Sequence, residues 1–177
     1  ANNLGVSNCT TPYVLILNPD IIINSRPINI LYDAYLKYDN AGILVPALYN
    51  ELNIRRTNGS LSYRKKKKSN SKNIKKINNL AEGDTCYDYA IGCAFLIKTS
   101  FFYSIGGFHK DFFMYFEDNE ICDRVYQNGK TVMEIPSSKM VHLQGLSSNI
   151  NILLNYKLSI IHKISEYIYF KKRNNII

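Results

Sequence analysis

The stretch Phe112–Pro136, FFMYFEDNEICDRVYQNGKTVMEIP, contains an aromatic run, a helix pattern and a strand pattern in close succession. The helix is expected over Glu117–Gln127, because Ile121, Cys122 and Val125 recur at the spacing of one helix face. The aromatic run before this helix is expected to pack beneath the residues that follow it.

A helix stop and a buried strand follow. Asn128-Gly129 should end the helix, since glycine readily takes the left-handed conformation found at helix ends. The run Thr131–Ile135 predicts a strand, which Pro136 should stop because proline cannot donate to a sheet ladder. Met140–Leu143 is expected to be a further extended segment.

The rest of the chain alternates short apolar runs with helical patterns. Short runs without polar residues suit strands that are buried on both faces, as in parallel sheets. Alternating strands and helices indicate an α/β fold, here with a mixed, mostly parallel sheet. The other expected strands are Tyr13–Leu17, Ala41–Pro46 and Ala90–Lys98, and the other expected helices are Arg26–Tyr38 and Ser100–Ile105.

Length and composition fit one domain with a tail. The chain has 177 residues, and a hydrophobic content of 46% is enough for a buried core. Residues 1–148 are expected to form the domain and residues 149–177 an amphipathic helical tail, while 53–79 has the composition of a basic, mobile surface loop. The four cysteines form no CxxC pair, which favours reduced thiols in a cytoplasmic setting.

The positive charge is concentrated in one segment. Ten of the 22 lysine and arginine residues lie between Arg55 and Lys76, and the net charge of the whole chain is +8. A nucleic-acid site would need aromatic side chains for stacking, and this segment has only Tyr63, so nucleic acid is an unlikely partner. A solvated loop and contact with an anionic membrane both fit the segment, and the amphipathic tail could lie on the same membrane surface. No apolar run reaches the roughly 20 residues needed to cross a bilayer.

Asp20 and His142 are candidate metal ligands. Asp20 follows the first expected strand, where a carboxylate can hold a divalent cation against a diphosphate, although Asn-Pro-Asp is also ordinary turn chemistry. His142 could complete a Mn²⁺ or Mg²⁺ shell with Asp20 and phosphate oxygens, or it could be a structural histidine.

Glu117-Asp118 are candidate catalytic acids at the start of the expected helix. A carboxylate there could take a proton from a hydroxyl, but acids also stabilise the first turn of a helix without any catalytic role. The two acids further along this helix, Glu120 and Asp123, are expected to be solvated.

Taken in order, these motifs resemble glycosyltransferase family 2, in the branch that looks like bacterial rhamnosyltransferases and galactofuranosyltransferases. The resemblance covers nearly the whole chain and is most specific over Phe112–Pro136. The strand–helix–strand section with which members of this family begin has no counterpart in the sequence. The other matching stretches are NNLG (Asn2–Gly5), YVLILNPD (Tyr13–Asp20), GCAFLIKTSFFYSIGGF (Gly92–Phe108) and VHLQGLSS (Val141–Ser148).

The resemblance implies the glycosyltransferase A fold, a Rossmann-like α/β sandwich, and a single inverting displacement. Asp118 would be the catalytic base, and Glu117 would help to orient the site. Asp20 and His142 would hold Mn²⁺ or Mg²⁺, which offsets charge on the departing diphosphate. Contacts with the nucleotide sugar would come from Asn3, Asp20, Gly92 and Cys93.

Residues 1–148 would then be the C-terminal portion of a catalytic domain that transfers a sugar from a UDP- or dTDP-sugar to a glycan or lipid-linked acceptor. Such a metal-dependent, hexosyltransferase-like enzyme would act in the cytoplasm or at the inner face of the cell membrane, in cell-surface polysaccharide synthesis. The alternatives are a non-catalytic remnant that keeps the fold without the nucleotide pocket, and a basic nucleic-acid-binding protein.

Overall fold

The structure is a computed structural model that describes residues 1–60, 80, 82–143 and 152–174. A mixed sheet organises it, with the central order β1–β8–β3–β9–β2. The five strands are β1 (Tyr13–Leu17), β8 (Ala94–Lys98), β3 (Ala41–Tyr49), β9 (Thr131–His142) and β2 (Ile21–Ile22). Two short strands extend the sheet, β4 (Arg55–Arg56) on β3 and β6 (Thr85–Tyr87) on β9, and β5 (Gly59–Ser60) pairs separately with β7 (Tyr89–Ala90).

The mixed α/β architecture with a C-terminal helix is confirmed, but the expected predominance of parallel strands is wrong. Among the described strands the β3–β9 pair is parallel, whereas β1–β8, β3–β8, β2–β9, β3–β4 and β6–β9 are antiparallel. The reason lies in β8, whose first four residues are buried although both of its neighbours run in the opposite direction. An apolar run therefore reports that both faces of a strand are covered, and it carries no information on strand direction.

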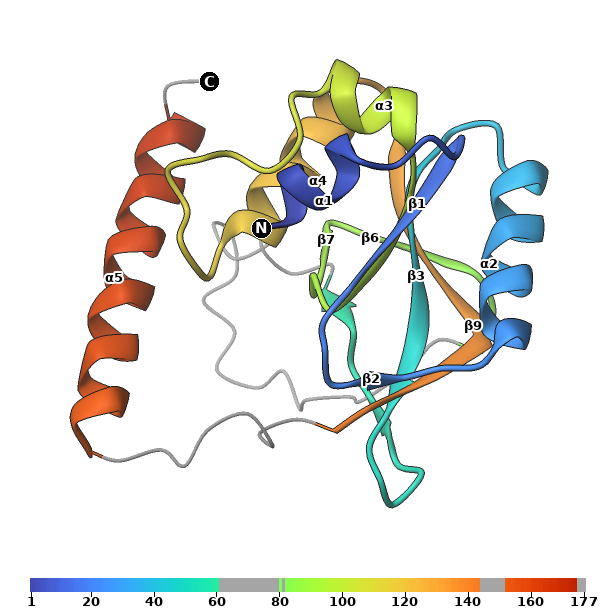
Figure 1. Cartoon of the computed structure of the whole chain (residues 1–177), viewed down its shortest axis with the longest axis horizontal. Coiled ribbons are helices and arrows are strands. Elements are labelled where there is room, and N and C mark those ends of the chain that lie inside the picture. The colour runs from blue at the N-terminus through green and yellow to red at the C-terminus, as the bar shows by residue number, and fades with distance from the viewer. Residues whose placement is uncertain (61–79, 81, 144–151, 175–177) are drawn as a thin grey trace, which may run out of the picture.

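Helices cover both faces of the sheet (Figure 1). One face packs against α1 (Asn2–Ser7), α3 (Thr99–Ser104) and α4 (Glu117–Gln127), and the other packs against α2 (Ser25–Lys37). Alternate residues of β3 divide between the two cores, because successive side chains of a strand point to opposite faces: Ile43 and Val45 lie in the α4 core and Leu44 in the α2 core.

The helix patterns place α2 and α4 close to their observed bounds. The Asn24 side chain caps α2 by accepting a hydrogen bond from the Arg26 backbone N–H at 3.1 Å. α4 begins at Glu117 and ends at Gln127 as expected, and Gly129 follows it with φ +71°. The left-handed conformation at Gly129 turns the chain directly into β9.

Pro136 does not stop the strand, contrary to expectation. β9 runs from Thr131 to His142 with a register shift, in which Ile135 lies opposite Pro46 and Lys139 lies opposite Ala47. Pro136 falls in the three-residue excursion between these partners, where no ladder N–H is required of it. Ser138 in the same excursion is fully buried and donates a hydrogen bond to the Pro27 carbonyl at 2.9 Å, so the bulge is fixed against α2.

The expected strand Ala90–Lys98 is also interrupted. Its first residue ends β7 and its last five form β8, so residues 91–93 make an unpaired turn between two strands. This turn carries Gly92 and Cys93 to the edge of the sheet, next to the first turn of α4.

A buried charge ties three strands together. Glu134 of β9 is fully buried, and its Oε2 accepts hydrogen bonds from Arg55 at 3.0 Å and from the Tyr87 hydroxyl at 2.7 Å. Burial raises the pKa of Tyr87, and the Glu134 carboxylate adds to that rise. The phenol therefore stays protonated as a donor, and the paired charge holds β4 and β6 against β9.

The final helix, α5 (Ile152–Asn174), stands beside the sandwich at the left of Figure 1. Its second half is anchored: Ser165 donates to the Met114 carbonyl at 2.7 Å, and the Tyr169 hydroxyl donates to Asp123 at 2.7 Å. Asp123 is therefore held by α5 and is not the freely solvated acid that the helix pattern predicted. Among the described helices, none combines the length and the apolar character that crossing a membrane requires.

Two parts of the expected layout lie outside the described residues. They are most of the basic segment, residues 61–79, and residues 144–151, which include the end of VHLQGLSS and the start of the tail. The expectation of a mobile basic loop therefore stays a prediction.

The close approach of α4 to the sheet gives a stability prediction. A Cβ on Gly42 would lie 2.5 Å from Val125 Cγ1 and 2.9 Å from Lys130 Cβ, so Gly42→Ala should lower the free energy of unfolding by about 1–3 kcal/mol. Gly5→Ala is the matched control, because nothing lies within 4 Å of its Cβ position and alanine favours the helix by up to about 1 kcal/mol. Urea unfolding followed by circular dichroism measures both, and equal stability of the two variants would contradict this packing.

Candidate functional site

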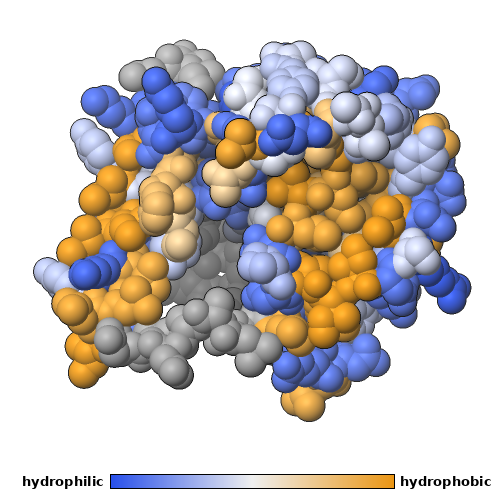
Figure 2. All heavy atoms as spheres, in the orientation of Figure 1, coloured by the Kyte–Doolittle hydropathy of each residue, from blue (hydrophilic) through white to orange (hydrophobic). Residues whose placement is uncertain are grey.

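A cleft of about 670 Å³ opens where the 91–93 turn, the first turn of α4 and α5 come together. Figure 2 shows this side of the molecule hollowed between α5 and the body of the domain. The lining comes from segments far apart in the sequence. The lining residues are Asn18, Tyr89, Ile91, Gly92, Cys93, Phe113, Met114, Tyr115, Phe116, Glu117, Asp118, Asn119 and His162.

Asp118 is held rigidly at the base of the cleft. Its Oδ2 accepts a hydrogen bond from the Gly92 backbone N–H at 3.1 Å, and its Oδ1 accepts one from the Asn119 N–H at 2.8 Å. A Cβ on Gly92 would lie 3.0 Å from Asp118 Cβ, so glycine permits this approach. Burial raises the pKa of Asp118 above its ordinary range, and the backbone N–H groups oppose the rise only in part. A carboxylate with a raised pKa is a stronger base towards a hydroxyl proton.

Glu117 lies beside it with an unsatisfied oxygen. Its Oε2 is buried, and no group in the described part of the chain makes a hydrogen bond to it. Burial raises the pKa of Glu117, and the neighbouring charge of Asp118 adds to the rise. Buried polar atoms are almost always paired in folded proteins, so this oxygen is suited to accept a hydrogen bond from a ligand hydroxyl.

A strained backbone turn aims both acids into the cleft. Tyr115 and Phe116 both have left-handed backbone conformations, with φ 68° and 65°, which bulky residues rarely adopt. Each such residue costs on the order of 1–3 kcal/mol, and strain of this kind gathers at functional sites. Phe116 is kept in place by α5, since its ring centroid lies 5.4 Å from that of Tyr169 and 5.2 Å from that of His162.

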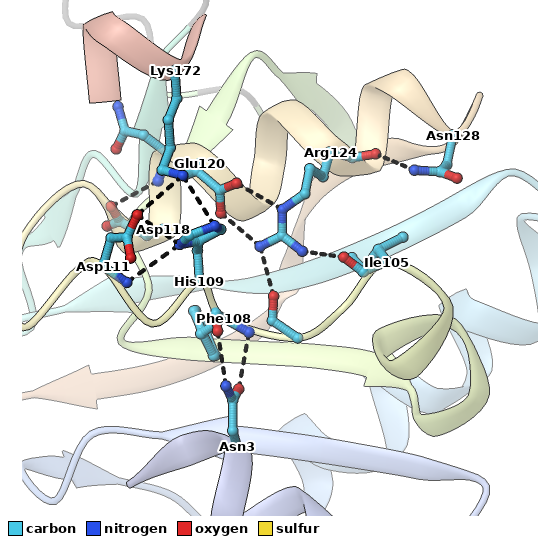
Figure 3. Close-up of polar contacts among 12 residues, drawn as sticks. Asn3, Ile105, Phe108, His109, Asp111, Asp118, Glu120, Arg124, Asn128 and Lys172 are labelled. Carbon is cyan, nitrogen blue, oxygen red and sulfur yellow. Dashed lines mark hydrogen bonds and ion pairs between the residues drawn. The ribbon is translucent and has the colours of Figure 1, made fainter. Parts of the chain in front are cut away.

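An arginine clamp fixes the other side of α4 (Figure 3). Arg124 donates to both carboxylate oxygens of Glu120, at 2.8 and 2.6 Å, and to the backbone carbonyls of Gly107, at 2.6 Å, and Ile105. Glu120 is 9% exposed and fully engaged, so the expectation that it is solvated is wrong. The i,i+4 spacing of Glu120 and Arg124 was a visible signal for this pair, whereas the contacts of Arg124 with the 105–107 loop depend on tertiary packing.

Asp20 and His142 meet, as the candidate metal site requires. The Oδ2 of Asp20 lies 3.2 Å from Nε2 of His142, and the pairing of Ile21 with His142 between β2 and β9 sets this position. The Leu143 N–H donates to the Asp20 carbonyl at 3.0 Å and closes the end of the ladder. The two candidate ligands lie far apart in the sequence, and the pairing of β2 with β9 brings them together.

The pair fits a divalent cation in chemistry and in spacing. A carboxylate oxygen and an imidazole nitrogen are both ligands of Mn²⁺, and a site with fewer protein ligands also suits Mg²⁺. Two ligands on one edge of an octahedron with bonds of about 2.1 Å are about 3.0 Å apart, close to the separation here. Within residues 1–60, 80, 82–143 and 152–174, no group of three or more His, Cys, Asp or Glu residues could hold a metal. Other ligands would have to come from phosphate oxygens and water.

Cys93 links the metal pair to the acid pair. Its carbonyl accepts a hydrogen bond from the Asn18 N–H at 2.9 Å, two residues before Asp20. Burial raises the pKa of the Cys93 thiol to about 12, and the carboxylates of Asp118 and Asp20 both add to the shift. The thiol therefore stays protonated and is unsuited to act as a nucleophile. The two carboxylates lie on either side of one short turn.

Asn3 lies apart from the cleft lining. Its amide donates to the Phe108 carbonyl at 2.8 Å and accepts from the Phe108 N–H at 2.9 Å, as Figure 3 shows. Both ends of the amide are thus engaged in holding the loop that follows α3. A contact between Asn3 and a nucleotide sugar stays a prediction.

Sequence reasoning missed the aromatic and histidine side chains of the cleft, namely Tyr89, Phe113 and His162. The run FFMYF was a visible signal, but it was expected to pack inward, whereas Phe112 is buried and Phe113 is 84% exposed. The position of His162 in the cleft could not be predicted, because a single histidine in an amphipathic helix does not indicate which residues it will contact.

A second hollow of about 570 Å³ lies on the α2 and α3 side of the domain, lined by residues that include Tyr35, Lys98, Ser104 and Lys130. It contains none of the expected site residues. Its lining has two lysines and one acid, Asp39, whereas the described lining of the cleft beside Asp118 has acids and no lysine or arginine.

Comparison with known proteins agrees with this architecture. No protein-family model matches the chain. It is 27% identical over 159 residues to the low-salt glycan biosynthesis hexosyltransferase Agl10 of Haloferax volcanii, a match over 81% of this chain and 47% of the relative. The crystal structure of GalNAc-T7 with UDP, GalNAc and Mn²⁺ superposes with a TM-score of 0.60 at 15% identity, covering 82% of this chain and 30% of that one.

The chain thus spans about half the length of its curated relative and less than a third of the solved structure. The match to the GalNAc-T7 structure shows the fold. The sequence match is to a hexosyltransferase, which is a glycosyltransferase. The chain has the glycosyltransferase A fold, and its similarity to a hexosyltransferase supports a glycosyltransferase function.

Proposed function

We propose that this chain is the C-terminal portion of an inverting glycosyltransferase domain that transfers a sugar from a nucleotide diphosphate to an acceptor hydroxyl. One observation carries the proposal. Asp118 has a raised pKa, is oriented by the Gly92 N–H at 3.1 Å, and lies in an open cleft one short turn away from the Asp20–His142 pair. A base on one side of this turn and a candidate cation site on the other suit attack at an anomeric carbon that lies between them.

In the proposed mechanism Asp118 accepts the proton of the acceptor hydroxyl as that oxygen attacks the anomeric carbon. The sugar leaves the diphosphate in the same step, so the configuration at that carbon inverts. Glu117 accepts a hydrogen bond from a hydroxyl of the bound sugars through its unpaired Oε2 and orients them. The backbone at Gly92 keeps the Asp118 carboxylate in one position throughout.

Asp20 and His142 are the residues that would hold Mn²⁺ or Mg²⁺. A bound cation supplies Lewis-acid stabilisation of the departing diphosphate. The turn that carries Gly92 and Cys93 lies between this pair and the base, and we assign it, with Asp20, to the donor side. The GalNAc-T7 structure was solved with UDP and Mn²⁺, which supports this assignment for a UDP-sugar, and a dTDP-sugar is the alternative donor.

We place the enzyme in the synthesis of a cell-surface or lipid-linked glycan in the cytoplasm, in the rhamnosyltransferase- and galactofuranosyltransferase-like branch. The glycan-synthesis hexosyltransferase supports the general setting. A non-catalytic remnant is the alternative, and failure to bind a nucleotide would favour it. Nucleic-acid binding is the weaker alternative, because the cleft is lined by acids and aromatics.

We also propose that α5 touches an anionic membrane. Its outward side exposes the apolar residues Leu153, Tyr156, Ile160, Ile164 and Tyr167, and a shallow apolar groove of about 440 Å³ lies among them. Lys157 and Lys163 are exposed on the same helix. Apolar groups flanked by lysines are typical of helices that lie in the headgroup region.

The role of Asp118 as a base predicts a particular dependence of stability on pH. A carboxyl whose pKa is raised by folding stabilises the protein below its unfolded pKa, and this contribution is lost as pH rises through the folded pKa. The stability of the native chain relative to Asp118→Asn should therefore fall as pH rises from about 4, the ordinary value for aspartate. Urea unfolding at a series of pH values measures this, and a difference that is flat or rises with pH would contradict the raised pKa.

The donor site predicts metal-dependent nucleotide binding. UDP or dTDP should bind in the presence of Mn²⁺, and Asp20→Ala should weaken that binding at least about tenfold, as loss of a metal ligand does elsewhere. Asp33→Ala is the control, because Asp33 is an exposed acid on α2. Isothermal titration calorimetry measures the affinities. Binding of neither nucleotide, or equal binding by the Asp20 and Asp33 variants, would oppose a working donor site.

The membrane proposal is tested by flotation with phosphatidylglycerol vesicles at low salt. The chain should float with the vesicles, and Ile160→Ser with Ile164→Ser should reduce the bound fraction by about fivefold or more, because each loses about 1 kcal/mol or more of apolar burial. Phosphatidylcholine vesicles are the control for charge. Absence of flotation at low salt would reject the proposal.

A further inference from the structure

Aromatic side chains line the acceptor side of the cleft, and one of them, Phe113, is largely exposed. Phe113 is 84% exposed although it lines the cleft, and Tyr89 and Tyr115 line it as well. Phe113 contributes nothing to the buried cores, whereas its neighbour Phe112 is 8% exposed. A large ring held open to a cavity beside catalytic acids is suited to contact a ligand.

His162 completes this wall from α5. Its ring centroid lies 5.2 Å from that of Tyr115 and 5.2 Å from that of Phe116. α5 is fixed one turn further on by Ser165 and two turns further on by Tyr169, so the imidazole lines the cleft from an anchored part of the helix. In the described part of the chain no hydrogen bond occupies its ring nitrogens, which leaves them able to bind a hydroxyl.

The charge of the cleft selects against anions. Glu117 and Asp118 are the acids of its lining, and no lysine or arginine appears among the described lining residues. A phosphate or carboxylate group placed there would meet two acids, and none of the described lining residues is a lysine or arginine that could offset the repulsion in this partly buried setting. The nearby cation site at Asp20 and His142 lies on the donor side of the 91–93 turn.

We propose that this aromatic wall, Tyr89, Phe113, Tyr115, Phe116 and His162, binds a neutral sugar ring of the acceptor. The apolar C–H face of the ring packs on the aromatic side chains, and its hydroxyls bond to His162 and to Glu117 Oε2. One hydroxyl is thereby presented to Asp118. This proposal rests on the proposed glycosyl transfer. It adds that the reacting end of the acceptor is an uncharged sugar, and that His162 of α5 contributes to its recognition.

The test uses the full chain with UDP and Mn²⁺, and follows binding of methyl hexosides by saturation-transfer difference NMR. At least one of the methyl α- and β-glucosides, galactosides, mannosides and rhamnosides should receive saturation at its ring C–H protons. Phe113→Ala and His162→Ala should each weaken that binding about tenfold, the effect of losing one aromatic contact. Glucose 6-phosphate and mannose 6-phosphate should bind more weakly than the neutral hexosides.

Tyr167→Ala is the matched control, because Tyr167 is an exposed aromatic on the outward side of α5, and it should leave hexoside affinity within about twofold. UDP affinity is measured for each variant and should match the native chain, and thermal unfolding checks that each variant is folded at the temperature of the binding measurement. Equal hexoside binding by the Phe113 and His162 variants, or preferential binding of sugar phosphates, would overturn the proposal. UDP binding without any hexoside binding would overturn it and leave the transferase function standing, whereas absence of both would contradict the function itself.

Discussion

The site depends on one close approach, that of Asp118 to the backbone of Gly92. The carboxylate accepts the Gly92 N–H at 3.1 Å, and no side chain fits between the two residues, so the start of α4 and the 91–93 turn are fixed relative to each other. α4 is in turn pressed against β3 at Gly42 and clamped to the 105–107 loop by Arg124. Directly before α4, Tyr115 and Phe116 take left-handed backbone conformations that lead the chain into the first turn of that helix.

This constraint gives the acids their chemistry. Because the first turn of α4 is held against the sheet edge, Asp118 is buried enough for its pKa to rise, while the cleft beside it stays open to a ligand. The 91–93 turn contacts both candidate sites, because Gly92 donates to Asp118 and the Cys93 carbonyl accepts from Asn18, two residues before Asp20. α5 closes the remaining side through contacts made by its second half. The proposed base, donor site and acceptor wall all depend on the packing of the 91–93 turn, the first turn of α4 and α5.

Local signals in the sequence were sufficient for several elements. α4 and β1 have the predicted bounds. α4 shows a clear helical period and ends before Asn128-Gly129, and β1 is an apolar run that ends at Asn18-Pro19. Asp20 and His142 were paired as possible ligands from their chemistry, and the family resemblance implied the same pair, but no local pattern predicts that residues so far apart in the sequence meet. Strand direction, the bulge at Pro136 and the part played by His162 depend on tertiary pairing, which no spacing along the chain records. Phe113 shows the same limit, because an aromatic side chain in a motif looks the same whether it faces a core or a cleft.

The central claim is that the nucleotide and its cation sit beside the Asp118 cleft. Paramagnetic broadening of backbone amide signals by Mn²⁺ bound with UDP measures this directly, because the effect falls off steeply with distance from the ion. The account predicts that the amides of Ile21, Gly92, Cys93 and Asp118 broaden first, and that Asp20→Ala removes the effect. Broadening centred instead on Tyr35, Lys98 and Lys130, around the second hollow, would contradict it.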